Sequence, residues 1–154
     1  MRLTVAAVGK PRNAALAAAI HDYETRAARY WPLEVHEVKE ERGKSSSAEV
    51  VKRESEKLLA ALPAGATVVV CDAAGESFTS EQFSHWMQSS RESARDVGIV
   101  IGGAHGLSDD LKVRASRRLS MGEWTMPHEM ARLVLAEQMY RAGTIVRGEP
   151  YHKA

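Results

Sequence analysis

Three segments in the second half of the chain hold residues whose types and spacing could do chemistry, and the first is a run of glycines. Gly102, Gly103 and Gly106 lie within five residues of one another. Glycine lets the backbone approach a ligand closely and adopt positive φ angles. Taken alone, the run could also be a tight turn between a strand and a helix.

The second segment is an apolar but irregular stretch, residues 121–126. Its two methionines, Met121 and Met126, and its tryptophan, Trp124, could line a pocket for a flat, partly apolar cofactor. A loop that only covers the core would have the same composition.

The third segment is the tail, residues 147–153, which brings a phenol, an imidazole and cations together. Tyr151 and His152 lie between Arg147 and Lys153. Histidine suits proton removal because its ordinary pKa is near neutrality. A frayed terminus is the usual alternative for such a segment.

Single residues exclude three near-matches to other motifs. Residues 43–45 end like a phosphate-binding loop, but Val38 stands where that loop needs its first glycine. The segment from His128 resembles a zinc-protease helix, but Arg132 replaces the second histidine ligand. Ala104 breaks the dinucleotide-binding signature. Since the sequence has no Cys/His cluster with zinc spacing, we expect no metal site.

Apolar runs alternate with helical patterns along the whole chain. We predict strands at residues 3–8, 33–38, 67–71, 97–101 and 119–121. Helices between and after them are predicted from the N-caps Asn13, Ser46, Thr79 and Ser108 and from Pro127. This order favours one α/β domain, residues 1–154, with a mostly parallel sheet.

Such sheets bind ligands beyond the carboxyl ends of their strands. We therefore expect the strand ends at Cys71, Gly102 and Met121 to meet. The final helix, predicted over residues 127–142, is apolar on two sides. One side should cover the sheet, and the other should meet a ligand or a partner chain.

Composition limits the classes of function. The 154 residues carry a net charge of +1, which argues against coating nucleic acid through bulk charge. A local basic patch, residues 112–118, could contact RNA phosphates or be a solvated helix face. The single cysteine, Cys71, excludes an internal disulfide. We see no signal peptide and no apolar run of membrane-spanning length, and expect a cytoplasmic protein.

In combination, these segments resemble the SPOUT methyltransferases. The resemblance rests on residues 99–107 (IVIGGAHGL), 125–128 (TMPH), 132–142 (RLVLAEQMYRA) and 150–153 (PYHK), and it covers the whole chain. It implies a trefoil knot, in which the last helix threads through a loop, and a homodimer with the site near the interface. The nearest members use S-adenosyl-L-methionine to methylate N3 of a pseudouridine in 23S rRNA of the assembled ribosome.

By position, the resemblance implies a cofactor site in which backbone groups usually read the adenine. Its residues would be Cys71, Gly102, Gly103, Met121, Gly122, Glu123, Trp124, Thr125 and Met126. Cys71 stands where the family often has Leu, and His105 stands where Glu or Asn is common. The second change leaves open whether this loop makes its usual polar contact.

We further hypothesise that Tyr151 and His152 close over the target base, by stacking or by removing the N3 proton. Arg141 would hold phosphate or developing negative charge, and Arg114, Arg118 and Lys153 would contact RNA. Methyl transfer of this kind depends on alignment and needs no metal. Two rivals stay open: a non-catalytic RNA- or ribosome-binding module on the same fold, and an α/β enzyme for another nucleotide-like ligand.

Overall fold

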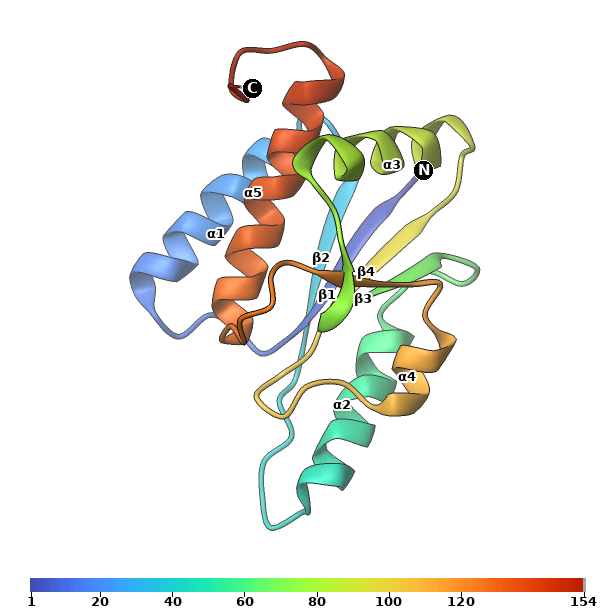
Figure 1. The fold of residues 1–154 in the computed structure, drawn as a ribbon. Helices are drawn as coiled ribbons and strands as arrows, with labels where there is room; N and C mark the ends of the chain where they lie inside the picture. The colour runs from blue at the N-terminus through green and yellow to red at the C-terminus, as the bar shows by residue number, and fades with distance from the viewer. Residues whose placement is uncertain (154) are drawn as a thin grey trace.

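A computed structural model describes residues 1–153. Strands and helices alternate from one end of the chain to the other (Figure 1). They are β1 (Leu3–Val8), α1 (Ala14–Ala27), β2 (Leu33–Val38), α2 (Ser47–Ala60), β3 (Thr67–Ser77), α3 (Ser80–Glu92), β4 (Val97–Ile101), α4 (Asp109–Arg114), β5 (Arg117–Ser120) and α5 (His128–Val146).

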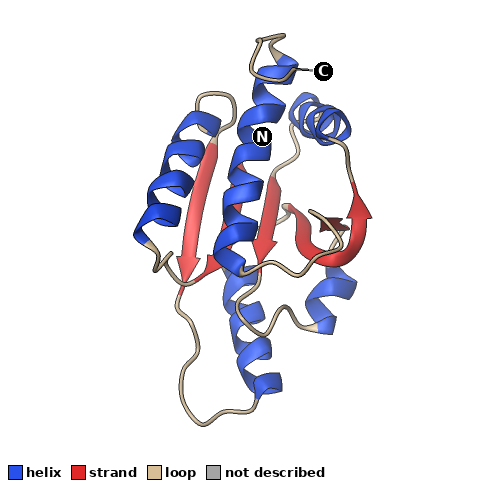
Figure 2. Cartoon of the chain, turned by 60° about the vertical axis from the view of Figure 1, so that its left-hand side comes forward, coloured by secondary structure: helices blue, strands red, loops and turns tan. Residues whose placement is uncertain are grey.

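The five strands form one sheet in the order β2-β1-β4-β3-β5, and every neighbouring pair is parallel. This confirms the predicted α/β class. Helices α1, α3 and α5 cover one face of the sheet, and α2 and α4 cover the other (Figure 1, Figure 2). Because all the strands run the same way, their carboxyl ends lie at one edge of this three-layered domain.

The two cores follow from the alternation of side chains along β1. Leu3, Val5 and Ala7 point into the core shared with α1, α3 and α5, whereas Ala6 and Val8 join the core under α2 and α4. All of β4 is buried, as expected for a strand inside a parallel sheet.

The helices begin at the predicted caps. Asn13, Ser46, Thr79 and Ser108 each accept a hydrogen bond from a backbone N–H of the first turn. Thr79 and Gln82 form a full capping box, with hydrogen bonds in both directions. Helix α5 follows Pro127, which makes no side-chain cap.

Strand β3 is longer than predicted and continues to Ser77. Its register against β5 shifts at a bulge between Cys71 and Glu76. Gly75 permits this path, because a Cβ there would lie 2.5 Å from the Arg118 carbonyl oxygen. Residues 72–77 (DAAGES) contain no large apolar side chain, so no burial pattern marked them as strand. They form a strand because they pair with β5.

Helix α5 packs tightly against α1 and α3. The Trp31 indole N–H donates to the Met139 carbonyl (2.8 Å), and a Cβ on Gly143 would collide with the Tyr30 ring. On the second apolar side of α5, which we expected to meet a ligand or partner, Tyr140 packs against the rings of Tyr23 and Tyr30, whereas Met130 stays 38% exposed. On the other side, a cavity of about 410 Å³ lies beside Val134 and Gln138.

A buried ion cluster fixes the first turns of α5. Arg132 is 7% exposed, and its Nε lies 2.8 Å from Glu24 Oε1 of α1. Its Nη1 lies 2.8 Å from Glu37 Oε1 of β2. Burial alone would lower the pKa of Arg132, but the two carboxylates outweigh burial and raise it. The guanidinium thus ties α5 to both neighbouring elements.

Candidate functional site

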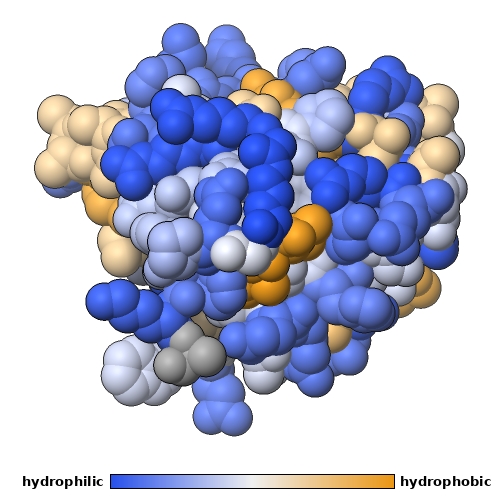
Figure 3. Space-filling view, turned by 90° about the horizontal axis from the view of Figure 1, so that it is seen from above, coloured by the Kyte–Doolittle hydropathy of each residue, from blue (hydrophilic) through white to orange (hydrophobic). Residues whose placement is uncertain are grey.

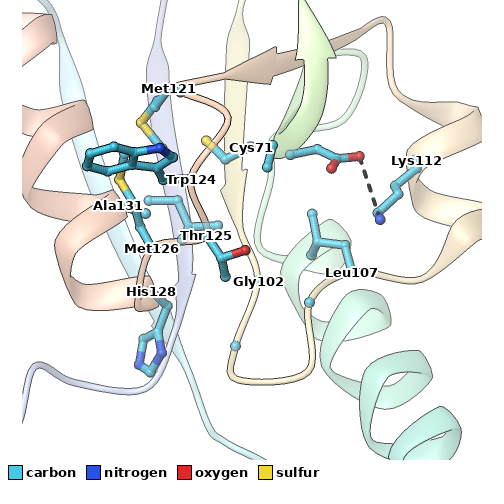
Figure 4. A pocket seen from close by; sticks show the side chains of 16 residues that line it. Cys71, Gly102, Leu107, Lys112, Met121, Trp124, Thr125, Met126, His128 and Ala131 are labelled. Carbon is cyan, nitrogen blue, oxygen red and sulfur yellow. Dashed lines mark ion pairs between the residues drawn. The ribbon is translucent and has the colours of Figure 1, made fainter.

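A cavity of about 200 Å³ lies where the carboxyl ends of β3 and β4 meet the loop before α5 (Figure 4). The three segments that the sequence predicted to meet, at Cys71, Gly102 and Met121, do meet here, although Cys71 lies within β3, where the bulge begins, and not at its end. The cavity is lined by Cys71, Asp72, Ala73, Ile101, Gly102, Gly103, Gly106, Leu107, Lys112, Met121, Gly122, Trp124, Thr125, Met126, His128 and Ala131.

The cavity is apolar on its α5 side and charged on its α4 side. Met121, Met126 and Ala131 gather on the first side, while Lys112 stands on the second (Figure 4). Trp124 is 84% exposed, so its ring offers a free surface at the cavity rather than a buried wall. Glu123 is exposed and does not line the cavity.

Glycines set the shape of the loop after β4. The Gly106 N–H donates to the Gly103 carbonyl (3.0 Å), and Gly106 has a φ of +80°. A Cβ on Gly102 would lie 2.9 Å from the Gly106 carbonyl carbon. The loop can therefore fold this closely only with glycine at position 102.

The loop after β5 is held by one hydroxyl. Ser120 Oγ lies 3.1 Å from the Ala73 carbonyl oxygen and accepts the Gly122 N–H (3.2 Å). Gly122 has a φ of +140°, in the region that favours glycine. These contacts tie residues 120–122 to the end of β3.

Two groups at the end of β3 have shifted pKa values. Burial raises the pKa of the Cys71 thiol to about 12, which keeps it neutral. Burial also acts to raise the pKa of Asp72, but hydrogen bonds from Arg118 and Ala74 and the charge of Lys112 outweigh it and lower that pKa. Arg118 Nη2 lies 2.7 Å and Lys112 Nζ 3.6 Å from Asp72 Oδ2. The charged side of the cavity is thus a carboxylate held by two cations.

The basic patch predicted to contact RNA is paired with carboxylates. Arg118 and Lys112 share Asp72, Arg117 contacts Glu76, and Arg114 Nε lies 3.1 Å from Asp110 Oδ2. The sequence showed no acid between positions 112 and 118. Two of these acids come from β3, which pairs with β5. RNA contact by Arg114 and Arg118 stays a prediction, as it does for the exposed Lys153.

The tail folds back on its own chain, away from the cavity. The Tyr151 hydroxyl donates to Glu137 Oε1 (3.0 Å), and the Arg141 guanidinium lies 4.9 Å from the Tyr151 ring centre. Burial, followed by hydrogen bonds to Tyr23 and Glu137, raises the pKa of Tyr151. His152 Nδ1 is buried without a hydrogen-bond partner among residues 1–153.

Arg141, Tyr151 and His152 therefore lie together, but none of them lines the cavity of its own chain. Arg141 follows His128 by more than three helical turns, a rise of roughly 20 Å. The tail lies at the far end of α5 (Figure 1), where hydrophilic side chains surround a small hydrophobic area (Figure 3).

Sequence reasoning missed several lining residues, chiefly Leu107, Lys112, His128 and Ala131. Leu107 directly follows the glycine run and Lys112 comes five residues later, so their closeness to the run could have predicted that they line the cavity. Within residues 1–153, no group of three or more metal-ligating side chains is arranged to hold a metal ion. No helix of that range is long and apolar enough to cross a membrane.

Several known proteins align with this chain over almost its whole length. A protein of Gemmatimonas aurantiaca is 61% identical over 154 residues, with 99% of this chain and all of the relative aligned. Relatives from an Anaeromyxobacter species and from Syntrophotalea carbinolica are 44% and 40% identical, each aligned over 99% of this chain and 100% and 99% of its own. All three are named "Ribosomal RNA large subunit methyltransferase H".

Solved structures share the fold at low sequence identity. TrmJ from Z. mobilis aligns with a TM-score of 0.51 at 16% identity, over 99% of this chain and 73% of its own. A probable methylase family protein from Haemophilus influenzae aligns with a TM-score of 0.56 at 9% identity, over 99% and 70%. The family model described as "Predicted SPOUT methyltransferase" matches residues 1–152. The chain therefore belongs to the SPOUT methyltransferase family.

Proposed function

We propose that the protein uses S-adenosyl-L-methionine to methylate N3 of a pseudouridine in 23S rRNA of the assembled ribosome. The observation that carries the proposal is the cavity at the edge of the sheet, which is formed by the glycine loop, an apolar wall and an ion cluster. The names of the relatives support the RNA substrate. Work on ribosomes would take place in the cytoplasm.

The cavity fits this cofactor in three respects. Gly102, Gly103 and Gly106 line the cavity without side chains, so a ligand can approach main-chain groups there. Met121, Met126 and Leu107 offer apolar surface to a flat adenine. Lys112 and Asp72 offer opposite charges to a ligand that itself carries both signs.

When bound, S-adenosyl-L-methionine would supply an activated methyl group. The chain would then have to align the base with that methyl group, exclude water and help the N3 proton leave. Trp124, exposed at the cavity, could stack on a base turned out of the RNA. In this proposal the residues of loops 102–106 and 121–126 hold the cofactor and take no part in proton transfer.

Tyr151, His152 and Arg141 would serve the target base only from a second copy of the chain. In their own chain they lie at the opposite end of α5 from the cavity. In a homodimer with two-fold symmetry, the tail of one protomer could reach the cavity of the other. The buried, unpartnered Nδ1 of His152 supports a role that needs another molecule. We also infer the trefoil knot from family membership.

Calorimetric titration with S-adenosylhomocysteine tests the cofactor. We expect saturable binding that is lost in Gly102→Val, with the fold of the variant checked by circular dichroism. Methyl transfer to intact ribosomes, with naked rRNA in parallel, then tests the substrate. Absence of binding at high micromolar concentration would remove the methyltransferase proposal and leave the two rival functions.

Mixed dimers test the composite site. Gly102→Val disables the cavity and His152→Ala disables the tail, so each homodimer should be inactive. A heterodimer of the two variants would keep one intact cavity facing one intact tail, and about half of the wild-type activity per dimer should return. If every site used the tail of its own chain, the heterodimer would stay inactive.

A further inference from the structure

Glu54 of α2 is a buried carboxylate without a cation. It is 2% exposed, and among residues 1–153 no Lys, Arg or His nitrogen lies within 4.0 Å of its oxygens. Burying an unpaired carboxylate is costly, so such groups are kept where they hold other polar groups. Glu54 Oε2 does so, because it accepts the backbone N–H of Glu41 (3.0 Å).

The second oxygen of Glu54 faces the glycine loop. A Cβ on Gly103 would lie 2.9 Å from Glu54 Oε1, so the glycine makes room for the carboxylate. Glu54 also lines a hollow of about 310 Å³ together with Glu41, Arg42, Ala104 and His105. Glu54 therefore contacts two loops that are far apart in sequence, residues 39–42 and residues 102–106.

Neighbouring side chains of α2 hold the same two loops. Lys57 Nζ donates to the Lys39 carbonyl oxygen (3.2 Å) and pairs with the Glu41 carboxylate. Ser55 Oγ accepts the N–H of Ser108 (2.9 Å), just beyond the glycine loop. One turn of α2 thus anchors both loops, with Glu54 between them.

The two loops border neighbouring hollows, and Ala104 of the glycine loop lines the second of them. Gly102, Gly103 and Gly106 line the cavity proposed for the cofactor. Residues 39–42, together with Ala104 and His128, line an open groove of about 1080 Å³. His128 belongs to both linings, so the groove opens beside the cavity.

We propose that Glu54 is a positioning residue that ties the groove wall at residues 39–42 to the glycine loop at residues 102–106. Its Oε2 holds the Glu41 backbone by a hydrogen bond, and its Oε1 packs against Gly103. The cofactor cavity and the groove beside it then keep a fixed relation to each other. The inference rests on the proposed function only in taking the glycine loop as the cofactor loop.

The test compares Glu54→Ala and Glu54→Gln with the control Glu56→Gln, an exposed carboxylate two residues further along α2. Amide hydrogen exchange reads out the Glu41 N–H and residues 102–106, and calorimetry gives the affinity for S-adenosylhomocysteine. In Glu54→Ala we expect the Glu41 N–H to exchange about tenfold faster or more, since its charge-assisted bond is lost. Residues 102–106 should also exchange faster, because the carboxylate that packs against Gly103 is gone. Binding should weaken by a similar factor. Glu54→Gln keeps one acceptor and should fall in between, and Glu56→Gln should match wild type.

Wild-type exchange of both segments and unchanged binding in a folded Glu54→Ala protein would overturn the inference. A lower melting temperature with unchanged binding would also overturn it, because Glu54 would then only support the fold. If Glu54→Ala does not fold, the same two readouts on Glu54→Gln decide. If wild type itself does not bind S-adenosylhomocysteine, the proposed function fails, while the exchange comparison still decides on Glu54.

Discussion

Replacing Arg132 by methionine should destabilise the protein far more than replacing an exposed arginine. The change leaves the Glu24 and Glu37 carboxylates without their cation, at side-chain exposures of 14% and 26%. Removing one partner of a buried pair costs about 3–5 kcal/mol. Because both carboxylates keep some contact with water, we expect the lower end, about 3 kcal/mol. At this chain length, that lowers the melting temperature by roughly 6–12 °C.

Urea and thermal unfolding followed by circular dichroism measure this loss. Arg114→Met is the matched control, because Arg114 pairs with Asp110 one helical turn earlier at side-chain exposures of 65% and 72%, and such pairs contribute about 0.5 kcal/mol or less. Adding Glu24→Gln and Glu37→Gln to Arg132→Met removes the stranded charges and should recover most of the loss. A cost below about 1 kcal/mol for Arg132→Met, or no recovery in the triple variant, would refute the reasoning.

Two further predictions concern the end of β3. With its pKa raised to about 12, Cys71 should react with iodoacetamide at pH 8 at least about a thousand times more slowly in the folded protein than in urea. S-adenosylhomocysteine should slow it further, and equal rates with and without urea would contradict the burial argument. Asp72 has its pKa lowered in the fold, so its contribution to stability is present above about pH 4, the ordinary range of an unfolded Asp, and is lost as the pH falls through the folded value. Asp72→Asn should therefore cost about 1 kcal/mol at pH 7 and progressively less as the pH falls below about 4 in urea unfolding. A cost that does not change with pH would mean that packing, not charge, is lost.

Local patterns predicted the elements well because their causes are local. The caps at Asn13, Thr79 and Ser108 depend on residues within one turn. A continuous apolar run predicted the strand at residues 97–101, and the strand is buried along its whole length. The order of the strands could not be predicted, since it depends on which edges pair. The extension of β3 to Ser77 was missed for the same reason, because its cause is a partner strand more than forty residues later.

The candidate site divides in the same way. Strand ends and glycines predicted that Cys71, Gly102 and Met121 would meet, because a parallel sheet brings carboxyl ends to one edge. The acidic partners of the basic residues could not be predicted, since strand pairing brings Asp72 to Arg118. Glu54 gave no signal either, because one carboxylate in an amphipathic helix looks like any solvated residue. Only its burial distinguishes it.

The central pair of strands, β1 and β4, joins the start of the chain to its second half. Leu3 pairs with Val97, and Arg2 forms an ion pair with Asp96 across the same distance in sequence. At about 5–20 residues per second, synthesis leaves β1 without this neighbour for roughly 5–20 s. During that time the β1 edge that will pair with β4 stays open and its apolar side chains stay uncovered. Bringing β4 to β1 also closes a loop of more than ninety residues, which is slow. We therefore expect the nascent first half of the chain to need chaperone protection until β4 has left the ribosome.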